Sequence, residues 1–362
     1  MPYIIPILLF FLGLKFSKSR LVTLLFLIYF WVLMGLNSFT PDWGSYENIY
    51  DNYLFANTDS TEIGYVALCG LGNLAGLSYQ QFRMCFAAIY IVFVLLASRR
   101  LSEFPNYVLA LFLLWPFVPG VSGLRFSMAT IIVCFAVPFL FDGKKKGIVL
   151  YILWISIAML IHKSVAFFLV LLLARTKFNN KQERLILYCT LCLFLLIGAS
   201  DIMGRLPFIA DSPKLNKWLN LSADLGADHL SIMGVLLKAS FVIAYVVIVR
   251  YTSNILLKRA LFDVRGRNKI ILVRNTSYLL ILTIPGYIIS GEYQRFLSGS
   301  LMLFYAVFAD FCLMKLKGFS GEKRMIVIFI IFALIGITGG YYMLTMKSHD
   351  VLATLKDNLL FK

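Results

Sequence analysis

The sequence predicts an all-α protein that crosses a membrane about twelve times, and three observations lead to this fold class. Hydrophobic residues make up 60% of the 362-residue chain, charged residues make up only 14%, and the mean hydropathy is +0.83. Such a composition cannot cover a water-soluble surface. Apolar runs follow one another almost end to end, and a bilayer core needs roughly 20 apolar residues for each helical crossing. We therefore expect a single transmembrane domain over residues 1–362.

The expected crossings follow the apolar runs in chain order, and ten to fourteen of them would fit the pattern. They lie near 2–14, 21–36, 82–98, 106–121, 124–141, 148–161, 164–174, 185–200, 232–250, 275–290, 296–314 and 325–345. If the glycine-rich stretch 62–77 crossed the membrane, every later loop would lie on the opposite side from the one that its charge predicts. We therefore expect an outer interfacial or re-entrant helix there. The runs 2–14, 148–161 and 164–174 are short, which favours local thinning of the bilayer or half-helices.

The charged residues are divided unevenly between the loops. Of the 34 Lys and Arg residues, 23 lie in six segments that hold only 5 of the 18 Asp and Glu residues. These segments are 15–20, 99–103, 142–146, 175–184, 250–274 and 315–324. The positive-inside rule places them in the cytoplasm, with 250–274 as a long basic loop. The acidic-aromatic loop 37–81, the loop 201–230 and both termini then face outward. Because the basic residues occupy short turns, the net charge of +16 does not predict a nucleic acid partner.

The first outward loop alternates aromatic and acidic residues. The candidates there are Asp42, Trp43, Tyr46, Glu62 and Tyr65. Aromatic faces can stack on sugar rings, and carboxylates accept hydrogen bonds from hydroxyls, so this loop suits a carbohydrate site. The alternative is an aromatic belt at the level of the lipid headgroups, with solvated acids.

Two isolated arginines lie on the outer side, which the positive-inside rule disfavours. Arg125 opens an apolar run, and Arg295 follows Tyr293 and Gln294 at the start of a late one. A pyrophosphate ligand would explain both, because the planar guanidinium binds phosphate oxygens bidentately. The alternatives are arginines that snorkel to the interface, or an internal ion pair with Glu62 or Glu292.

One of the three histidines lies between two short apolar runs, at or below the outer surface. His162 could take a proton from a hydroxyl near neutral pH, and Lys163 adds a cation for phosphate. The alternative is a histidine that only packs in the core. We find no Walker or HExxH motif, and the six cysteines lie mostly in apolar runs. We therefore expect neither a cofactor nor a metal site.

The order of these features resembles the EpsG-like branch of the Wzy-type bacterial polysaccharide polymerases. The matching pieces are Asp42 with Tyr46 and Tyr50, Glu62-Ile63-Gly64-Tyr65, Leu124-Arg125-Phe126-Ser127-Met128-Ala129, His162-Lys163-Ser164-Val165-Ala166 and Arg295-Phe296. The resemblance covers most of the chain. Two positions depart from the family pattern: Phe126 stands where a glutamine is frequent, and Gln294 where a glutamate is frequent.

The resemblance implies a GT-C-type glycosyltransferase in the bacterial cytoplasmic membrane. Such a protein moves a growing glycan from undecaprenyl pyrophosphate to a lipid-linked repeat unit at the outer face, without a metal. Its partners would be these lipid-linked oligosaccharides and membrane lipids, and a chain-length regulator could dock on it. Arg125, Arg295 and Lys163 would bind the pyrophosphate. His162, Asp42 or Glu62 would orient or deprotonate the acceptor hydroxyl. Trp43, Tyr46, Tyr65 and Tyr293 would line the sugar path.

Three other functions fit part of the pattern: a flippase or transporter, a ligase that passes finished glycan to another acceptor, and an O-acetyltransferase. A transporter should carry polar residues toward both faces. Here the candidates gather on the outer side, and Asp310 is the one obvious intramembrane acid toward the cytoplasm. This distribution favours an enzyme.

Overall fold

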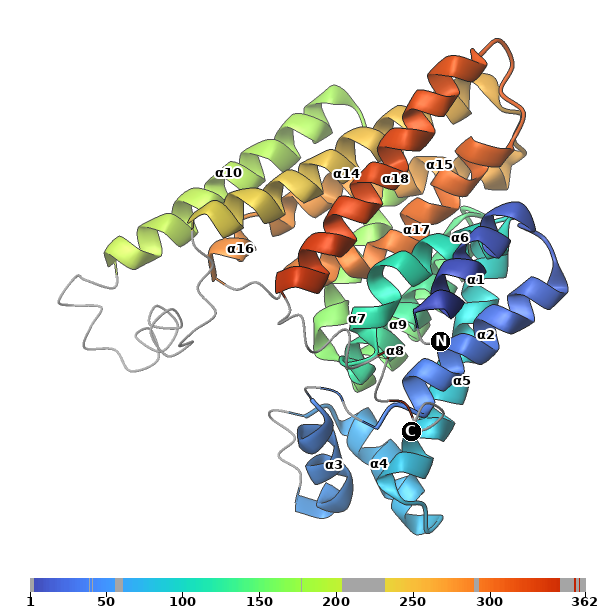
Figure 1. The fold of residues 1–362 in the computed structure, drawn as a ribbon. Helices are drawn as coiled ribbons and strands as arrows, with labels where there is room; N and C mark the ends of the chain where they lie inside the picture. The colour runs from blue at the N-terminus through green and yellow to red at the C-terminus, as the bar shows by residue number, and fades with distance from the viewer. Residues whose placement is uncertain are drawn as a thin grey trace.

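The computed structural model describes residues 3–38, 40, 42–55, 61–176, 178–203, 232–289, 293–345, 355 and 358. Helices make up nearly all of this part of the chain, and its only β-type pairing is an isolated bridge between Asn37 and Asn358 (Figure 1). The expected helical fold class is confirmed. Four of the described helices, α5, α14, α17 and α18, are long and apolar enough to cross a membrane. The protein is therefore a helical membrane protein, and the twelve crossings stay a prediction.

The helices follow one another along the chain in this order. The first half holds α1 (Ile4–Lys15), α2 (Arg20–Gly35), α3 (Trp43–Asp51), η1 (Tyr53–Phe55), α4 (Ile63–Leu74), α5 (Tyr79–Leu101), α6 (Pro105–Phe112), η2 (Leu113–Phe117), α7 (Val118–Gly120), α8 (Leu124–Ala136) and η3 (Val137–Leu140). The second half holds α9 (Lys145–Ile161), η4 (Lys163–Arg175), α10 (Asn180–Met203), α14 (Ile232–Arg259), α15 (Val264–Leu279), η5 (Leu280–Thr283), α16 (Gly286–Ile289), α17 (Gln294–Leu313) and α18 (Gly321–Thr345).

The six basic segments meet at one end of the bundle. Ion pairs and hydrogen bonds join them in a chain: Lys18 to Glu103, Lys269 to the Leu101 carbonyl, Arg265 to Asp142, Arg175 to the Gly143 carbonyl, Arg250 to Glu183, and Arg259 to the Lys317 and Gly318 carbonyls. This is the arrangement that the charge alternation predicts. The positive-inside rule predicts that this end faces the cytoplasm.

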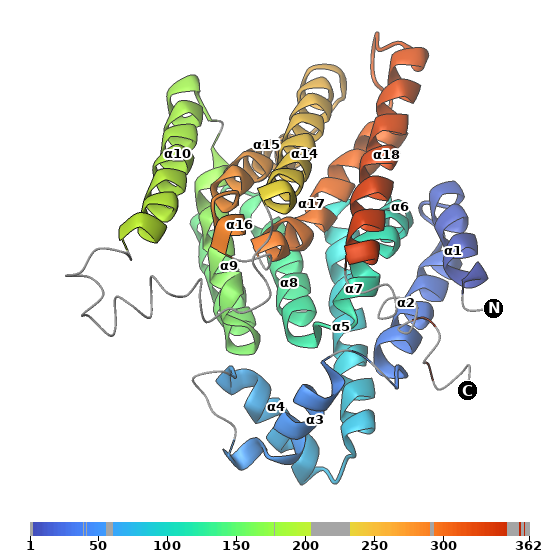
Figure 2. The ribbon, with the colours of Figure 1, turned by 60° about the vertical axis from the view of Figure 1, so that its left-hand side comes forward.

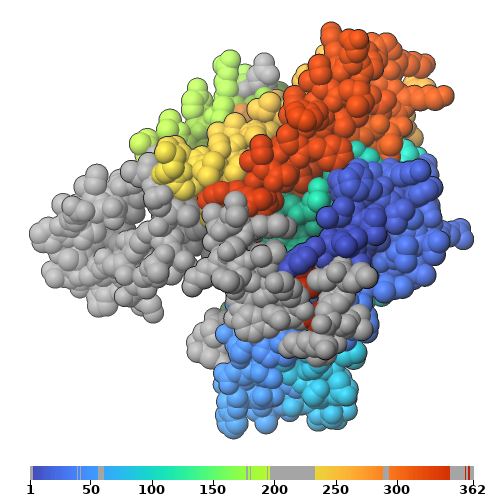
Figure 3. All heavy atoms as spheres, in the orientation of Figure 1, coloured from blue at the N-terminus to red at the C-terminus, as the bar shows by residue number. Residues whose placement is uncertain are grey.

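Helices α3 and α4 form a small lobe at the opposite end (Figures 2 and 3). They pack on the first turn of α5, where the Tyr50 ring lies 5.8 Å from that of Tyr79. The 12 residues of α4 span about 18 Å, which is too short for a crossing. Gly64 lets α4 approach α9, because a Cβ atom there would lie 2.5 Å from the Leu160 carbonyl oxygen. The interfacial or re-entrant placement of α4 stays a prediction.

The expected crossing at 106–121 is broken in the middle. The backbone leaves helical geometry at Trp115 (φ −164°, ψ 129°) and Pro116, so α6 and α7 are separate pieces joined by η2. Proline lacks the N–H that a helix interior needs, and it disfavours helical geometry in the residue before it. The break opens one wall of the cavity described below.

The short run at 164–174 forms a 3₁₀ helix instead of an α-helix. With a rise of about 2.0 Å per residue, the 13 residues of η4 extend about 26 Å, against about 20 Å as an α-helix. Its buried residues recur at every third position, as three residues per turn require: they are Val165, Phe168, Leu171 and Ala174. The run is therefore longer in space than its residue count indicates.

The segment 250–274, expected to be a basic loop, is helical except for residues 260–263. Helix α14 continues to Arg259, and Asp263 caps α15 by accepting a hydrogen bond from the Gly266 N–H at 2.7 Å. A few of its polar side chains are buried and paired inside the bundle. Arg274 donates to the side-chain oxygen of Asn254 at 3.2 Å, and Lys269 forms an ion pair with Asp310. The other outward loop, 201–230, lies almost wholly outside the described residues.

Asp310 is part of a closed polar cluster. Besides its pairing with Lys269, it accepts a hydrogen bond from the Ser102 hydroxyl at 3.4 Å, and only 2% of the residue is exposed. The acid that a transporter could have used is therefore held in a structural ion pair.

Candidate active site

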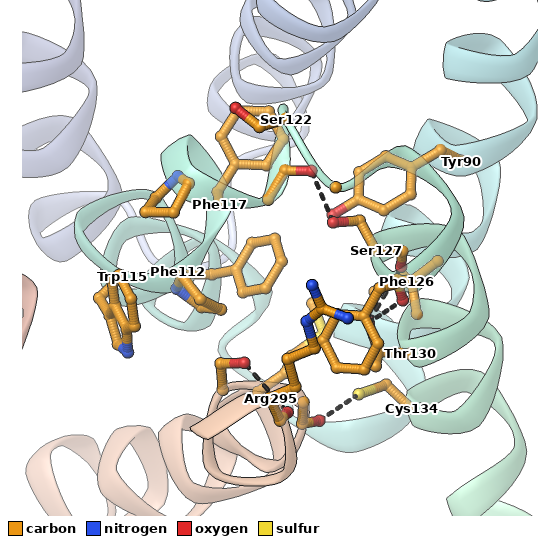
Figure 4. A pocket seen from close by; sticks show the side chains of 18 of the residues that line it. Tyr90, Phe112, Trp115, Phe117, Ser122, Phe126, Ser127, Thr130, Cys134 and Arg295 are labelled. Carbon is orange, nitrogen blue, oxygen red and sulfur yellow. Dashed lines mark hydrogen bonds between the residues drawn. The ribbon is translucent and has the colours of Figure 1, made fainter. Parts of the chain in front are cut away.

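A cavity of about 150 Å³ lies between the broken helix, α8, the first turns of α17 and the residue that precedes α3 (Figure 4). Its polar lining residues are Asp42, Ser122, Ser127, Thr130, Gln294, Arg295 and Ser298, and its aromatic ones are Tyr90, Phe112, Trp115, Phe117 and Phe126. The cavity is thus lined by an acid, a cation, hydroxyl groups and aromatic rings, which are the groups that bind a sugar phosphate.

Two helical stripes form facing walls of this cavity. The first, on α8, is Ser127, Thr130, Ile131 and Cys134, and the second, on α17, is Arg295, Ser298, Gly299 and Met302. Both sets have the i, i+3, i+4, i+7 spacing that places side chains on one face of an α-helix. The Cys134 thiol lies 3.6 Å from the Gly299 carbonyl, where the two helices meet. Ser127 donates to the Gly120 carbonyl at 2.6 Å and so holds the turn before α8 against the helix.

Arg295 extends from the first turn of α17 into the cavity (Figure 4). Its guanidinium carbon lies 5.7 Å from the centre of the Phe126 ring, and that ring packs edge-on against His162 with the centres 5.4 Å apart. Phe126 therefore stands between the cation in the cavity and the histidine. The sequence interpretation treated Phe126 only as a departure from the family pattern.

Glu62 is the centre of an ionic cluster beside the cavity. One carboxylate oxygen accepts a hydrogen bond from Arg125 at 2.7 Å, and the other accepts from the backbone N–H of Lys163 at 2.9 Å. The Nδ1 atom of His162 lies 4.0 Å from the same second oxygen. The ion pair that the sequence left open for Arg125 is therefore present, and it joins α8 to the beginning of α4.

Tyr46 and Tyr65 hold the other side of Arg125. The guanidinium carbon lies 5.5 Å from the Tyr46 ring centre and 5.6 Å from that of Tyr65, and the two rings are 5.8 Å apart. Both tyrosines are buried, and burial raises the pKa of each hydroxyl above 10, so both stay neutral. Neither lines the cavity, so their clear role is to hold the α3–α4 lobe against Arg125.

His162 is neutral at physiological pH. Burial lowers its pKa from 6.5 to about 4; the Glu62 carboxylate acts in the opposite direction, and the positive charges of Arg295 and Arg125 lower it further. Both arginines are thus close enough to act on the same imidazole. Nδ1 lies 2.9 Å from the Ser164 hydroxyl oxygen and accepts a hydrogen bond from the Ser164 N–H at 3.3 Å, a contact that favours the neutral tautomer with its proton on Nε2.

The remaining candidate residues lie around the cavity and the Glu62 cluster. Asp42 lines the cavity together with Arg295. Lys163 is exposed, and its backbone binds Glu62. Trp43 packs edge-on against Tyr79, with ring centres 5.0 Å apart. Tyr293 packs against Phe296 at 5.9 Å. Neither Trp43 nor Tyr293 lines the cavity.

Sequence reasoning missed the hydroxyl stripe of α8 and the broken helix. Ser127 and Thr130 are weakly polar residues in an apolar run, but their spacing marks one helical face. The Trp115–Pro116 step was the local signal of the break. In the described part of the chain, no group of three or more His, Cys, Asp or Glu residues could hold a metal ion.

Comparison with known proteins gives a family. The model of the EpsG family matches residues 4–355, which is nearly the whole chain. No curated protein and no solved structure matches it.

Proposed function

The chain belongs to the EpsG family, which supports a role of the polysaccharide-polymerase type, and we propose that the cavity is where it joins lipid-linked glycans. A growing glycan is transferred from undecaprenyl pyrophosphate to a hydroxyl of a lipid-linked repeat unit. The reaction takes place at the outer face of a bacterial cytoplasmic membrane, in a GT-C-type active site. The observation that carries the proposal is that Asp42 and Arg295, 253 positions apart in sequence, line one cavity at the end opposite the basic segments.

The reaction needs a base at one side of the reacting carbon and positive charge at the other. The acceptor oxygen attacks the anomeric carbon and loses its proton, while the bond from that carbon to the pyrophosphate oxygen breaks. The leaving lipid pyrophosphate gains negative charge, which a guanidinium fixed in a site of low dielectric stabilises strongly. Arg295 supplies this charge, and Asp42 accepts the proton.

The two other base candidates fit less well. Glu62 is already occupied by Arg125 and by the Lys163 N–H, so its carboxylate has little freedom to receive a proton. The neutral His162 presents an Nε2–H, which donates a hydrogen bond and accepts none. These contacts favour Asp42 as the base and give His162 the role of a hydrogen-bond donor to phosphate or hydroxyl.

Arg125 and Lys163 contribute charge from the neighbouring cluster. Arg125 is adjacent in sequence to Phe126, which contacts Arg295, so both guanidinium groups act on the same region. Because Arg125 is held by Glu62 and two tyrosine rings, it is pre-organised and loses little freedom when pyrophosphate binds nearby.

The test is chain elongation by the purified protein. The substrate is the undecaprenyl-pyrophosphate-linked repeat unit, extracted from cells that lack this protein. A polymerase produces a ladder of glycans of increasing length, a flippase only moves the unit across a vesicle membrane, and a ligase consumes it only when a second acceptor is added. A ladder that is lost in both Asp42→Asn and Arg295→Ala supports the proposal. A protein that binds the unit but makes no ladder rejects it.

A further inference from the structure

Arg83 is a buried cation that forms no ion pair within the described part of the chain. It lies in the second turn of α5, its residue is 0% exposed, and no described carboxylate forms an ion pair with it. A charge removed from water in a membrane protein is costly unless fixed dipoles compensate it, and such residues are usually retained for function. Arg83 therefore requires an explanation beyond packing.

The guanidinium contacts three segments that lie apart in the sequence. Its Nε donates to the carbonyl of Met34 at 2.7 Å, at the end of α2, where helix carbonyls lack partners within the helix. Its Nη2 donates to the carbonyl of Val121 at 3.2 Å, in the turn between α7 and α8. Its carbon lies 5.2 Å from the ring centre of Trp43, at the start of α3. One side chain thus joins α2, α3 and the turn before α8.

Two of these three segments carry the proposed chemistry. Gly120, Ser122 and Gly123, which flank Val121, line the cavity. Trp43 directly follows Asp42, which also lines the cavity. Arg83 contacts both segments, so the position of Asp42 relative to the Gly120–Gly123 wall depends on this side chain.

We propose that Arg83 is a positioning residue of this active site, which holds Asp42 and the Gly120–Gly123 wall at a fixed separation without contact with the substrate. The proposal rests on the proposed function, because it assigns Arg83 to that same cavity. A lysine could not replace it, since one ammonium on a flexible stem cannot reach two carbonyls and a ring face at once.

The test compares Arg83 with a matched neighbour on the same helix. Gln80 also donates to the end of α2, to the Gly35 carbonyl at 2.6 Å, but no described hydrogen bond joins it to Trp43 or Val121. The variants are Arg83→Lys, Arg83→Met and Gln80→Ala, assayed with the lipid-linked repeat unit and compared per folded protein. We expect kcat to fall roughly 10- to 100-fold in both Arg83 variants with little change in KM, because misplacing reacting groups by about 1 Å costs this much. We expect Gln80→Ala to stay within about twofold of wild type, since it loses only an anchor to α2.

A Trp43→Leu variant keeps the proposal testable if the Arg83 variants do not fold. It removes the contact between Arg83 and the Trp43 ring but keeps the buried charge. We expect kcat to fall in Trp43→Leu, and the double variant with Arg83→Met to have the same kcat as Arg83→Met alone. Unchanged kcat in folded Arg83 variants or in Trp43→Leu, or an equal loss in Gln80→Ala, would overturn the assignment. These results are distinct from failure of the proposed function, in which the wild-type protein itself makes no ladder.

Discussion

Arg125 donates a hydrogen bond to Glu62 over 2.7 Å, and this contact joins residues that are 63 positions apart. The pair lies beside His162, between the small outer lobe and the helix that carries the cavity's hydroxyl stripe. Of the two candidate acids, Glu62 is bound to a cation, whereas Asp42 lines the cavity.

Arg295→Ala should stop elongation while single repeat units accumulate. Loss of a fixed cation at the leaving group costs roughly 10²- to 10³-fold in kcat. Arg295→Lys should recover part of the rate, because a point charge stays but bidentate binding does not. Gel separation of the glycans measures chain length. Lys315→Ala, which removes an exposed cation at the opposite end, serves as the control. Ladders of wild-type length in Arg295→Ala as well as in Lys315→Ala would contradict the assignment.

Glu62→Gln should destabilise the protein more than the double variant Glu62→Gln with Arg125→Gln does. Removing the carboxylate alone leaves a mostly buried guanidinium without its counter-charge, at a cost of about 1–3 kcal/mol, whereas removing both partners avoids that penalty. Thermal unfolding in detergent gives the double-mutant cycle. Strictly additive losses would show that the pair has no coupling.

Gly64→Ala should lower both stability and activity. The added methyl would meet the Leu160 carbonyl oxygen at 2.5 Å and push α4 away from α9, at a cost of about 1–3 kcal/mol. The same displacement would lengthen the contact from Glu62 to the Lys163 N–H. Gly44→Ala in α3 is the matched control, since nothing lies within 4 Å of its added methyl and alanine favours a helix. Equal effects of both substitutions would contradict the close approach of α4 and α9.

His162 should make the fold less stable as the pH falls below neutral. Its pKa is about 4 in the folded protein and about 6.5 when unfolded, so the unfolded chain takes up the proton first. The resulting loss of stability begins below about pH 6.5 and is complete below about pH 4. His162→Asn should reduce the fall in melting temperature between pH 7 and pH 4.5, whereas Lys163→Met should leave it unchanged. An identical pH dependence in wild type and His162→Asn would show that the imidazole titrates normally.

Sequence reasoning succeeded where the physical rule acts along the chain. The positive-inside rule sorted the loops, and Lys269, Arg259 and Arg175 are indeed joined by hydrogen bonds to other basic segments at one end. Whether 62–77 crosses stays a prediction. Composition could not show that 264–274 is helical, because its basic residues count as loop-forming until the buried partner of Lys269 is known.

The candidate site shows the same limit. Isolated cations and acids on the outer side were visible in the sequence, and Arg125, Glu62, His162 and Lys163 do lie together. The sequence could not separate Asp42 from Glu62, because that distinction depends on which acid meets a fixed cation in three dimensions. It also could not place Trp43 against Arg83, since a ring in an acidic loop looks the same whether it faces a sugar or the core.

The 3₁₀ geometry of η4 affects how such chains are recognised. A search that requires 18 or more residues in one α-helix passes over η4, because it has only 13 residues. Every residue gains about a third more axial length in this geometry. A length criterion for 3₁₀ segments therefore has to be about a quarter shorter than the one used for α-helices.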